Sequence, residues 1–181
     1  PHGREPGEWL GITDFTVDET DREIIVTADR PYKFLYYDYN GNFLREKTSE
    51  AFYTEITRTT DNILAINSKV LEPKHYLSLL NEEDHRITVA KKIPLAFTYR
   101  GEFRCRGSYL LKSEHLYFTQ NGDYTIYSWD NNRIKPVVTV DFGKYSYNPT
   151  QLNEEPHAPA TRNKVLSIIN VKEIRSNLFF N

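Results

Sequence analysis

The sequence predicts an all-β fold built from β-propeller blades, each of them a four-stranded antiparallel sheet. Three observations lead to this prediction. Apolar and polar residues alternate with a period of two along most of the 181 residues, and helical periodicity is nearly absent. Aromatic residues make up 14% of the chain, with 13 Tyr and 10 Phe, which suits strands better than helices. Short strands recur in groups of four, which is typical of propeller blades.

The first group of strands spans about residues 12–48. Its apolar segments are separated by polar turns at 19–22, 29–31 and 40–42. Asn40-Gly41 lies between alternating apolar runs and is the strongest hairpin signal in the chain, because both central residues of such a turn need a positive φ. We therefore expect a tight hairpin with a positive φ at Asn40 and at Gly41.

The same pattern recurs further along the chain. A second group of four strands spans about residues 52–92 and a third about 95–142, with short turns at 58–62, 82–85, 112–115 and 130–132. A fourth group, with strands at 165–171 and 178–180, stops after residue 181 and is read as an incomplete blade. The hairpin tips near Asn40, Asp84 and Asn131 are 44 and 47 residues apart, which is the period of a propeller blade. A β-sandwich or barrel made of unrelated hairpins is the alternative.

Three segments resemble a known family. The opening 3–9, Gly-Arg-Glu-Pro-Gly-Glu-Trp, together with 14–18, resembles a Gly-Arg-x-Pro-Gly-Glu-aromatic blade junction. The segment 37–44 is similar to a YDxxGxFL hairpin, and 126–129 with 138–144 is similar to an IYxW…xVDFGK strand pair. The chain thus resembles the six-bladed, NHL-like β-propellers of Bacteroides-type envelope proteins, most of which have no known function. Glu5 departs from the pattern, because such junctions usually carry Gly there.

The resemblance implies a protein of the cell envelope, either periplasmic or attached to the outer membrane as a lipoprotein. Six blades need roughly 250 residues or more, whereas this chain supplies about three and a half blades in one partial propeller domain, 1–181. Since the chain also lacks Met, we expect it to be part of a longer protein whose targeting segment lies elsewhere. A closed four-bladed ring is the competing possibility.

An open ring should leave apolar side chains uncovered on its first and last sheets. The side chains expected to be exposed, or covered by the rest of the propeller or by another chain, are those of Phe15, Val17, Ile168, Ile169, Phe179 and Phe180.

Composition and charge exclude several classes of protein. With 23 Lys and Arg against 25 Asp and Glu, the net charge is −2, so a polybasic nucleic-acid-binding protein is not expected. The apolar runs are too short for a transmembrane segment. The basic stretch 162–175 alternates with apolar residues, as the solvated face of a strand does. The single cysteine, Cys105, excludes an internal disulfide; its neighbours Arg104 and Arg106 would favour the thiolate.

No catalytic motif, cofactor site or metal site is predicted. The five histidines are scattered without metal-ligand spacing: His2, His75, His85, His115 and His157. Four aspartates recur near strand ends: Asp14, Asp18, Asp38 and Asp141. Paired carboxylates could serve glycoside chemistry, but an aspartate in this position more often caps a turn through its own backbone.

The loops point to a binding face. In an up-and-down blade, the first and third connections share one end of the sheet, and here these are short. The other connections contain the long segments 1–11, 68–75, 93–107 and 143–164, and long loops on a rigid scaffold usually carry binding residues. The candidate binding residues on this face are Trp9, Arg30, Tyr32, His75, Tyr99, Arg100, Arg104, Arg106 and His157.

These observations favour a non-enzymatic binding or scaffold module that engages a protein or glycan partner through its long-loop face. A glycan hydrolase or lyase that uses carboxylates or histidines of the same face is the alternative. Carboxylates or histidines converging within hydrogen-bond reach at that face would favour the enzyme. A partial propeller that completes the ring of another chain is a third possibility.

Overall fold

The computed structural model describes residues 3, 5–66, 76–94, 110–112, 115–119, 123–130, 133–146, 164–165 and 168–180. Within these ranges the fold is all-β, and one turn of 3₁₀ helix, η1 (Gly143–Tyr145), is the single helical element. The chain forms two compact units. Unit 1 comprises Pro1–Lys69 and Tyr76–Pro94, and unit 2 comprises Val70–His75 and Leu95–Asn181.

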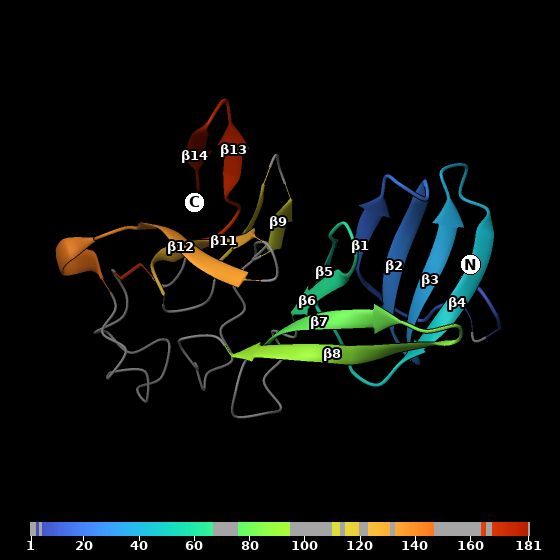
Figure 1. The fold of residues 1–181 in the computed structure, drawn as a ribbon. Coiled ribbons are helices and arrows are strands. Elements are labelled where there is room, and N and C mark those ends of the chain that lie inside the picture. The colour runs from blue at the N-terminus through green and yellow to red at the C-terminus, as the bar shows by residue number, and fades with distance from the viewer. Residues whose placement is uncertain are drawn as a thin grey trace. The chain divides into compact units, whose positions relative to one another are not determined.

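Unit 1 consists of two antiparallel meanders of four strands each. The first contains β1 (Ile12–Asp18), β2 (Glu23–Asp29), β3 (Tyr32–Asp38) and β4 (Phe43–Ser49), which lie side by side in chain order in Figure 1. The second contains β5 (Glu55–Arg58), β6 (Ile63–Ile66), β7 (Tyr76–Glu82) and β8 (Arg86–Pro94). Two parallel pairs, Thr48 with Arg86 and Ser49 with Ile87, join β4 to β8 and make one eight-stranded sheet.

The main core of unit 1 lies between the two meanders. Because side chains alternate across a pleated strand, one face of the first meander presents Ile25, Phe34 and Tyr36, which are almost completely buried. The second meander contributes Ile56, Ile63, Ala65, Leu80 and Ile87 to the same cluster, and the segment before β5 contributes Tyr53. Each meander therefore covers the apolar face of the other.

The opposite face of the first meander carries a second, smaller core of Val26, Ala28 and Leu35. Trp9, from the segment that precedes β1, packs against this cluster. The entry segment thus covers part of a sheet face that would otherwise be exposed.

The two terminal strands of the eight-stranded sheet, β1 and β5, are linked by side chains. Asp14 Oδ2 accepts a hydrogen bond of 2.7 Å from the backbone N–H of Ile56, and Thr16 Oγ1 accepts one of 3.0 Å from that of Arg58. Burial raises the pKa of Asp14, although the backbone N–H groups of Ile56 and Phe15 act in the opposite direction. Side-chain oxygens here take the place of a neighbouring strand.

Unit 2 contains a third antiparallel meander and a hairpin. The meander comprises β9 (Leu110–Lys112), β10 (Leu116–Phe118), β11 (Thr125–Asp130) and β12 (Arg133–Thr139), and the hairpin comprises β13 (Lys172–Ile174) and β14 (Asn177–Phe179). Its core consists of Tyr117, Ile126, Ile168 and Val171.

Strand positions in unit 2 differ from the sequence prediction. Of the strand expected at 165–171, residues 165 and 168–171 are described: Val165 makes an isolated bridge with Ser146, and 168–171 belong to no strand. The paired strands lie at 172–174 and 177–179. The fourth strand of the third meander begins at Arg133 rather than at Val137 and includes Pro136. Proline is tolerated there because β12 is an edge strand and the register shifts beside it.

The prediction of uncovered apolar side chains was right for some positions and wrong for others. Phe15, Phe179 and Phe180 are exposed to 62%, 55% and 37%. Val17 and Ile169 are half-buried. Ile168 is completely buried, because Tyr117 and Ile126 of its own unit cover it.

The geometry of the β3–β4 turn differs from the prediction at Asn40. Gly41 has a φ of +84°, but Asn40 is not among the residues with positive φ. Asp38 determines the turn instead: its Oδ1 accepts from the backbone N–H groups of Asn40 and Asn42, while its carbonyl accepts from that of Gly41. A hydrogen bond from the Asn42 side chain is the main cause that lowers the pKa of Asp38. The turn therefore needs a left-handed residue at one position only.

We expect Gly41→Val to destabilise the protein by about 1 kcal/mol or more, because a β-branched residue is strained in the left-handed region. Asn40→Ala is the matched control and should change the free energy of unfolding by less than about 0.5 kcal/mol. Thermal or urea denaturation of both variants measures this. Equal losses in the two variants would support the two-position turn that the sequence suggested.

Candidate functional site

The register of β1 with β2 defines two ends of the first meander. Asp18 pairs with Glu23 at the end that carries the short turns, and Ile12 pairs with Ala28 at the end where the entry segment and the β2–β3 connection meet. Each end carries a distinct group of polar side chains.

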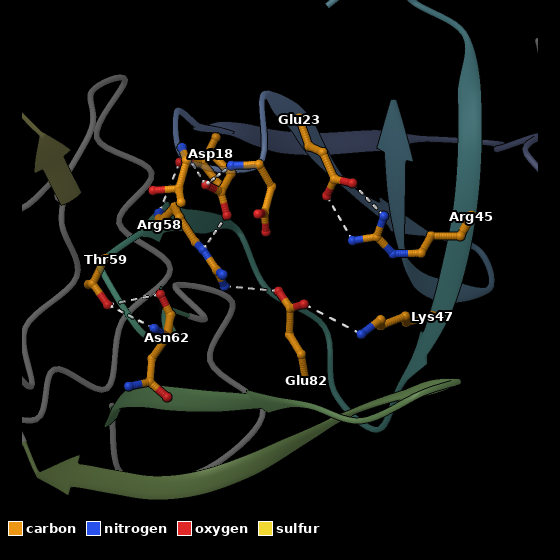
Figure 2. Close-up of polar contacts among 11 residues, drawn as sticks. Asp18, Glu23, Arg45, Lys47, Arg58, Thr59, Asn62 and Glu82 are labelled. Carbon is orange, nitrogen blue, oxygen red and sulfur yellow. Dashed lines mark hydrogen bonds and ion pairs between the residues drawn. The ribbon is translucent and has the colours of Figure 1, made fainter. Parts of the chain in front are cut away.

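The short-turn end contains a network of ion pairs centred on Arg58. Arg58 Nε lies 2.7 Å from Asp18 Oδ2, and its Nη1 lies 3.0 Å from Glu82 Oε1. The other oxygen of Glu82 is 3.4 Å from Lys47 Nζ. Figure 2 shows Arg58 between the two carboxylates, with Lys47 on the far side of Glu82. The network joins β1 and β4 of the first meander to β5 and β7 of the second.

A second ion pair lies beside the network. The Arg45 guanidinium makes two hydrogen bonds to the Glu23 carboxylate, at 2.5 and 2.7 Å (Figure 2). The same guanidinium lies 4.1 Å from the centre of the Tyr36 ring, a cation–π distance. Burial, followed by the nearby charge of Glu82, raises the pKa of the Tyr36 hydroxyl above its usual range.

The network has the properties of a structural clamp. The Asp18 carboxylate is bound to Arg58, and the Glu82 carboxylate is shared between Arg58 and Lys47. These ion pairs join side chains of β1 and β4 to side chains of β5 and β7. The arrangement therefore suits the joining of the two meanders.

The aspartates predicted from the sequence also bind backbone N–H groups. Asp18 Oδ1 accepts from Thr20 and Asp21 in the β1–β2 turn, and Asp141 Oδ1 accepts from Gly143. The capping interpretation is thus confirmed for Asp18, Asp38 and Asp141. Asp14 differs, because it caps an amide of another strand rather than a local turn.

The other end of the first meander, where Ile12 pairs with Ala28, is called the long-loop end here. It contains a hollow of about 660 Å³. Among the described residues it is lined by Leu10, Asp29, Arg30, Pro31 and Tyr32. The lining is mostly apolar, and its two charged side chains are adjacent in sequence, with Arg30 Nε 3.5 Å from Asp29 Oδ2. The Tyr32 ring is 44% exposed and makes a tilted contact with Phe52, at 5.8 Å between ring centres.

The entry segment that provides Leu10 is fixed by Glu46. Glu46 Oε2 accepts hydrogen bonds of 2.9 Å from the backbone N–H of Gly7 and from the amine of buried Lys33. The Tyr37 hydroxyl donates to the Gly7 carbonyl, and the Asp29 N–H donates to the Gly11 carbonyl. Gly11 is required by space, since a Cβ there would lie 2.4 Å from Asp29 Oδ1.

The structure brings two of the predicted binding residues together. Arg30 and Tyr32 line the hollow, whereas Trp9 packs against the small core beneath it. The other candidates lie outside the described residues: His75, Tyr99, Arg100, Arg104, Arg106 and His157. Cys105 also lies outside them. The sequence analysis missed Leu10, Asp29 and Pro31; adjacency to Arg30 was the one available signal for Asp29 and Pro31.

The described histidines are exposed. His85 lies in the β7–β8 turn, and His115 Nδ1 is 2.8 Å from Glu173 Oε2. Within the described part of the chain, no three His, Cys, Asp or Glu side chains are grouped as they would be around a metal ion. Nor is any helix in that part long and apolar enough to cross a membrane.

Comparison with known proteins identifies the family. The whole chain, residues 1–181, matches the family described as "Domain of unknown function (DUF4934)". The chain belongs to this family. No curated protein matches the sequence of this family member.

A solved structure shares the fold of this DUF4934 chain. It is that of a "Putative exported protein" from Bacteroides fragilis, with a TM-score of 0.62 at 19% sequence identity. The alignment covers 79% of this chain and 41% of the Bacteroides fragilis chain. The DUF4934 chain therefore spans less than half the length of that protein.

We expect Arg58→Ala to destabilise unit 1 by about 3 kcal/mol, because it leaves two largely buried carboxylates without their shared cation. Arg86→Ala is the control: its side chain is 53% exposed and that of its partner Glu50 is 49% exposed, so the loss should be no more than about 1 kcal/mol. Urea denaturation measures both. Similar losses for the two arginines would show that the network does not clamp the meanders.

The anchoring of the entry segment should depend on pH. Burial acts to raise the pKa of Glu46, but the hydrogen bonds from Gly7 and Lys33 outweigh it and place the pKa below 4.5. A group with a lowered folded-state pKa stabilises the fold above its unfolded-state pKa, and the contribution is lost as the pH falls through the folded-state value. Hydrogen exchange at the Gly7 amide, corrected for intrinsic rates, should therefore lose protection below pH 4.5.

Glu46→Gln is the control for this effect. It keeps a hydrogen-bond acceptor but cannot titrate, so protection of Gly7 should be weaker and independent of pH. The same pH dependence in the variant would assign the effect to another group.

Proposed function

We propose that the chain is a non-enzymatic binding module of the bacterial cell envelope and that it engages a protein or glycan partner at the hollow of the long-loop end. The observation that carries this proposal is the joint lining by Arg30 and Tyr32. Both residues are among the binding candidates that the sequence predicts. An arginine beside an exposed aromatic ring is a common recognition pair.

One end of unit 1 carries stabilising ion pairs and the other carries the hollow, and this separation supports a binding function. The Arg58 network at the short-turn end ties the two meanders together. The hollow at the other end is bounded by a strand connection and by an entry segment held through Glu46. A rigid sheet that presents a shaped loop region is the usual design of a binding module.

We propose further that the meanders are blades of a six-bladed, NHL-like propeller. Three successive antiparallel meanders of four strands support this, as does the blade-length period of the hairpin tips. Exposed Phe15 and Phe179 are then the side chains that further blades or another chain would cover. The parallel link between β4 and β8 is a departure from separate blades.

The envelope location is proposed on two grounds. One is the resemblance of the sequence motifs to envelope propellers. The other is that the Bacteroides fragilis protein of similar fold is described as exported. The alternative of a glycan hydrolase or lyase is not favoured, because the described carboxylates that converge are held by cations.

Ligand-observed NMR with a mixed library of small molecules tests the binding function. We expect binders whose signal is lost in the double variant Arg30→Ala/Tyr32→Ala, because both side chains line the hollow.

The chain offers a matched control for this test. Arg22 lies 5.6 Å from the ring centre of Tyr39, which is 45% exposed, and neither residue is among the described lining residues of the hollow. Arg22→Ala/Tyr39→Ala should keep the binders. A library without binders, or binders lost equally in both variants, would contradict the assignment of function to the hollow.

A further inference from the structure

The lining residues of the hollow indicate which chemical class of ligand it binds. This inference rests on the proposed binding function. We propose that it binds a neutral sugar ring, with the apolar face of the ring against Tyr32 and neighbouring hydroxyls on Asp29 and Arg30.

The charges of the hollow cancel locally. Arg30 Nε lies 3.5 Å from Asp29 Oδ2, and these are the two charged residues of its described lining. An anionic ligand attracted to Arg30 would meet the Asp29 carboxylate, and a cationic ligand attracted to Asp29 would meet the guanidinium. The pair therefore selects against both and favours a ligand without net charge.

The same pair has hydrogen-bonding capacity that the fold does not use. Asp29 Oδ1 is buried and faces Gly11, so Oδ2, which has the 3.5 Å contact with Arg30, is the oxygen of this carboxylate that a ligand in the hollow would reach. The Arg30 side chain is 74% exposed, which leaves most of its five N–H donors toward solvent. An acceptor and a donor side by side match two adjacent hydroxyl groups, one of which donates while the other accepts. A purely apolar ligand would desolvate both charges without compensation.

The rest of the lining offers an apolar surface. Tyr32 presents a ring that is 44% exposed and braced by Phe52. Leu10 and Pro31 complete the lining on either side. A pyranose has such a composition, since its C–H groups form an apolar face and its hydroxyls lie at the rim. Neither a charged peptide side chain nor a lipid chain combines both features.

Titration of ¹⁵N-labelled protein with methyl glycosides of glucose, mannose, galactose and N-acetylglucosamine tests this. At least one should shift the backbone signals of residues 29–32, with a dissociation constant of about 1 mM, as expected for a small open site. The constant should change less than about twofold between 0.05 and 0.5 M NaCl, since a neutral ligand is insensitive to screening.

Variants separate a stacking contact from general disturbance of the site. Tyr32→Leu should raise the dissociation constant at least about tenfold, while Tyr32→Phe, which keeps the ring, should stay within about threefold. Tyr39→Leu, at an equally exposed ring of the opposite end, should leave it unchanged. Equal constants for Tyr32→Leu and the wild type would overturn the proposed stacking.

Three further probes distinguish failure of this inference from failure of the binding function. N-acetyl-lysine methylamide is cationic, acetate is anionic and p-cresol is apolar. If one of these shifts residues 29–32 and no glycoside does, the hollow binds another class and the sugar inference is wrong while the binding function stands. If no glycoside and no further probe shifts these signals, both proposals fall.

Discussion

The Arg58 guanidinium is the contact on which the arrangement of unit 1 depends most. It reaches from β5 to Asp18 on β1 and to Glu82 on β7, so that one side chain ties two meanders that share only two residue pairs in the sheet. The apolar faces of the meanders supply most of the buried area. Burial is non-directional, however, and would allow the sheets to rotate against each other. The Arg58–Asp18 and Lys47–Glu82 ion pairs each join a strand of one meander to a strand of the other at one end, and they restrict that rotation.

The same restriction has consequences at the other end of the unit. The hollow is formed by the β2–β3 connection and the entry segment, and its shape depends on how both are held. Glu46 holds the entry segment from the face opposite the main core. Glu46 thus acts on the entry segment that contains Leu10, whereas Arg30 and Tyr32 lie at the β2–β3 connection. Contacts that shape the hollow are in this way separable from contacts that line it.

Much of the fold could be predicted because it follows from local chemistry. A period of two in apolar residues is imposed by the pleat of a strand, and the polar turns at 19–22, 58–62 and 82–85 separate strands as expected. The capping role of Asp18 and Asp141 was likewise readable, since the amides that they accept from are two or three residues away. The all-β character therefore needed no knowledge of the tertiary structure.

The features that could not be predicted depend on partners distant in sequence. Whether Ile168 is buried depends on Tyr117 and Ile126, which lie over 40 residues away. Leu10 and Asp29 become part of the hollow only because the entry segment folds back on the first meander. The predicted positive φ of Asn40 was wrong for a different reason. The Asp38 carboxylate offers the turn a set of hydrogen bonds that competes with the geometry favoured by Asn-Gly.

The side-chain link between β1 and β5 has a consequence for how the protein behaves in a crowded solution. Unpaired amides on a terminal strand are a template on which other chains assemble into aggregates. In unit 1 the outward amides of Ile56 and Arg58 are already taken by Asp14 and Thr16. A foreign strand would have to displace a carboxylate and a hydroxyl that are built into the fold. The Asp14 side chain thus occupies an amide that would otherwise be free to pair with a foreign strand.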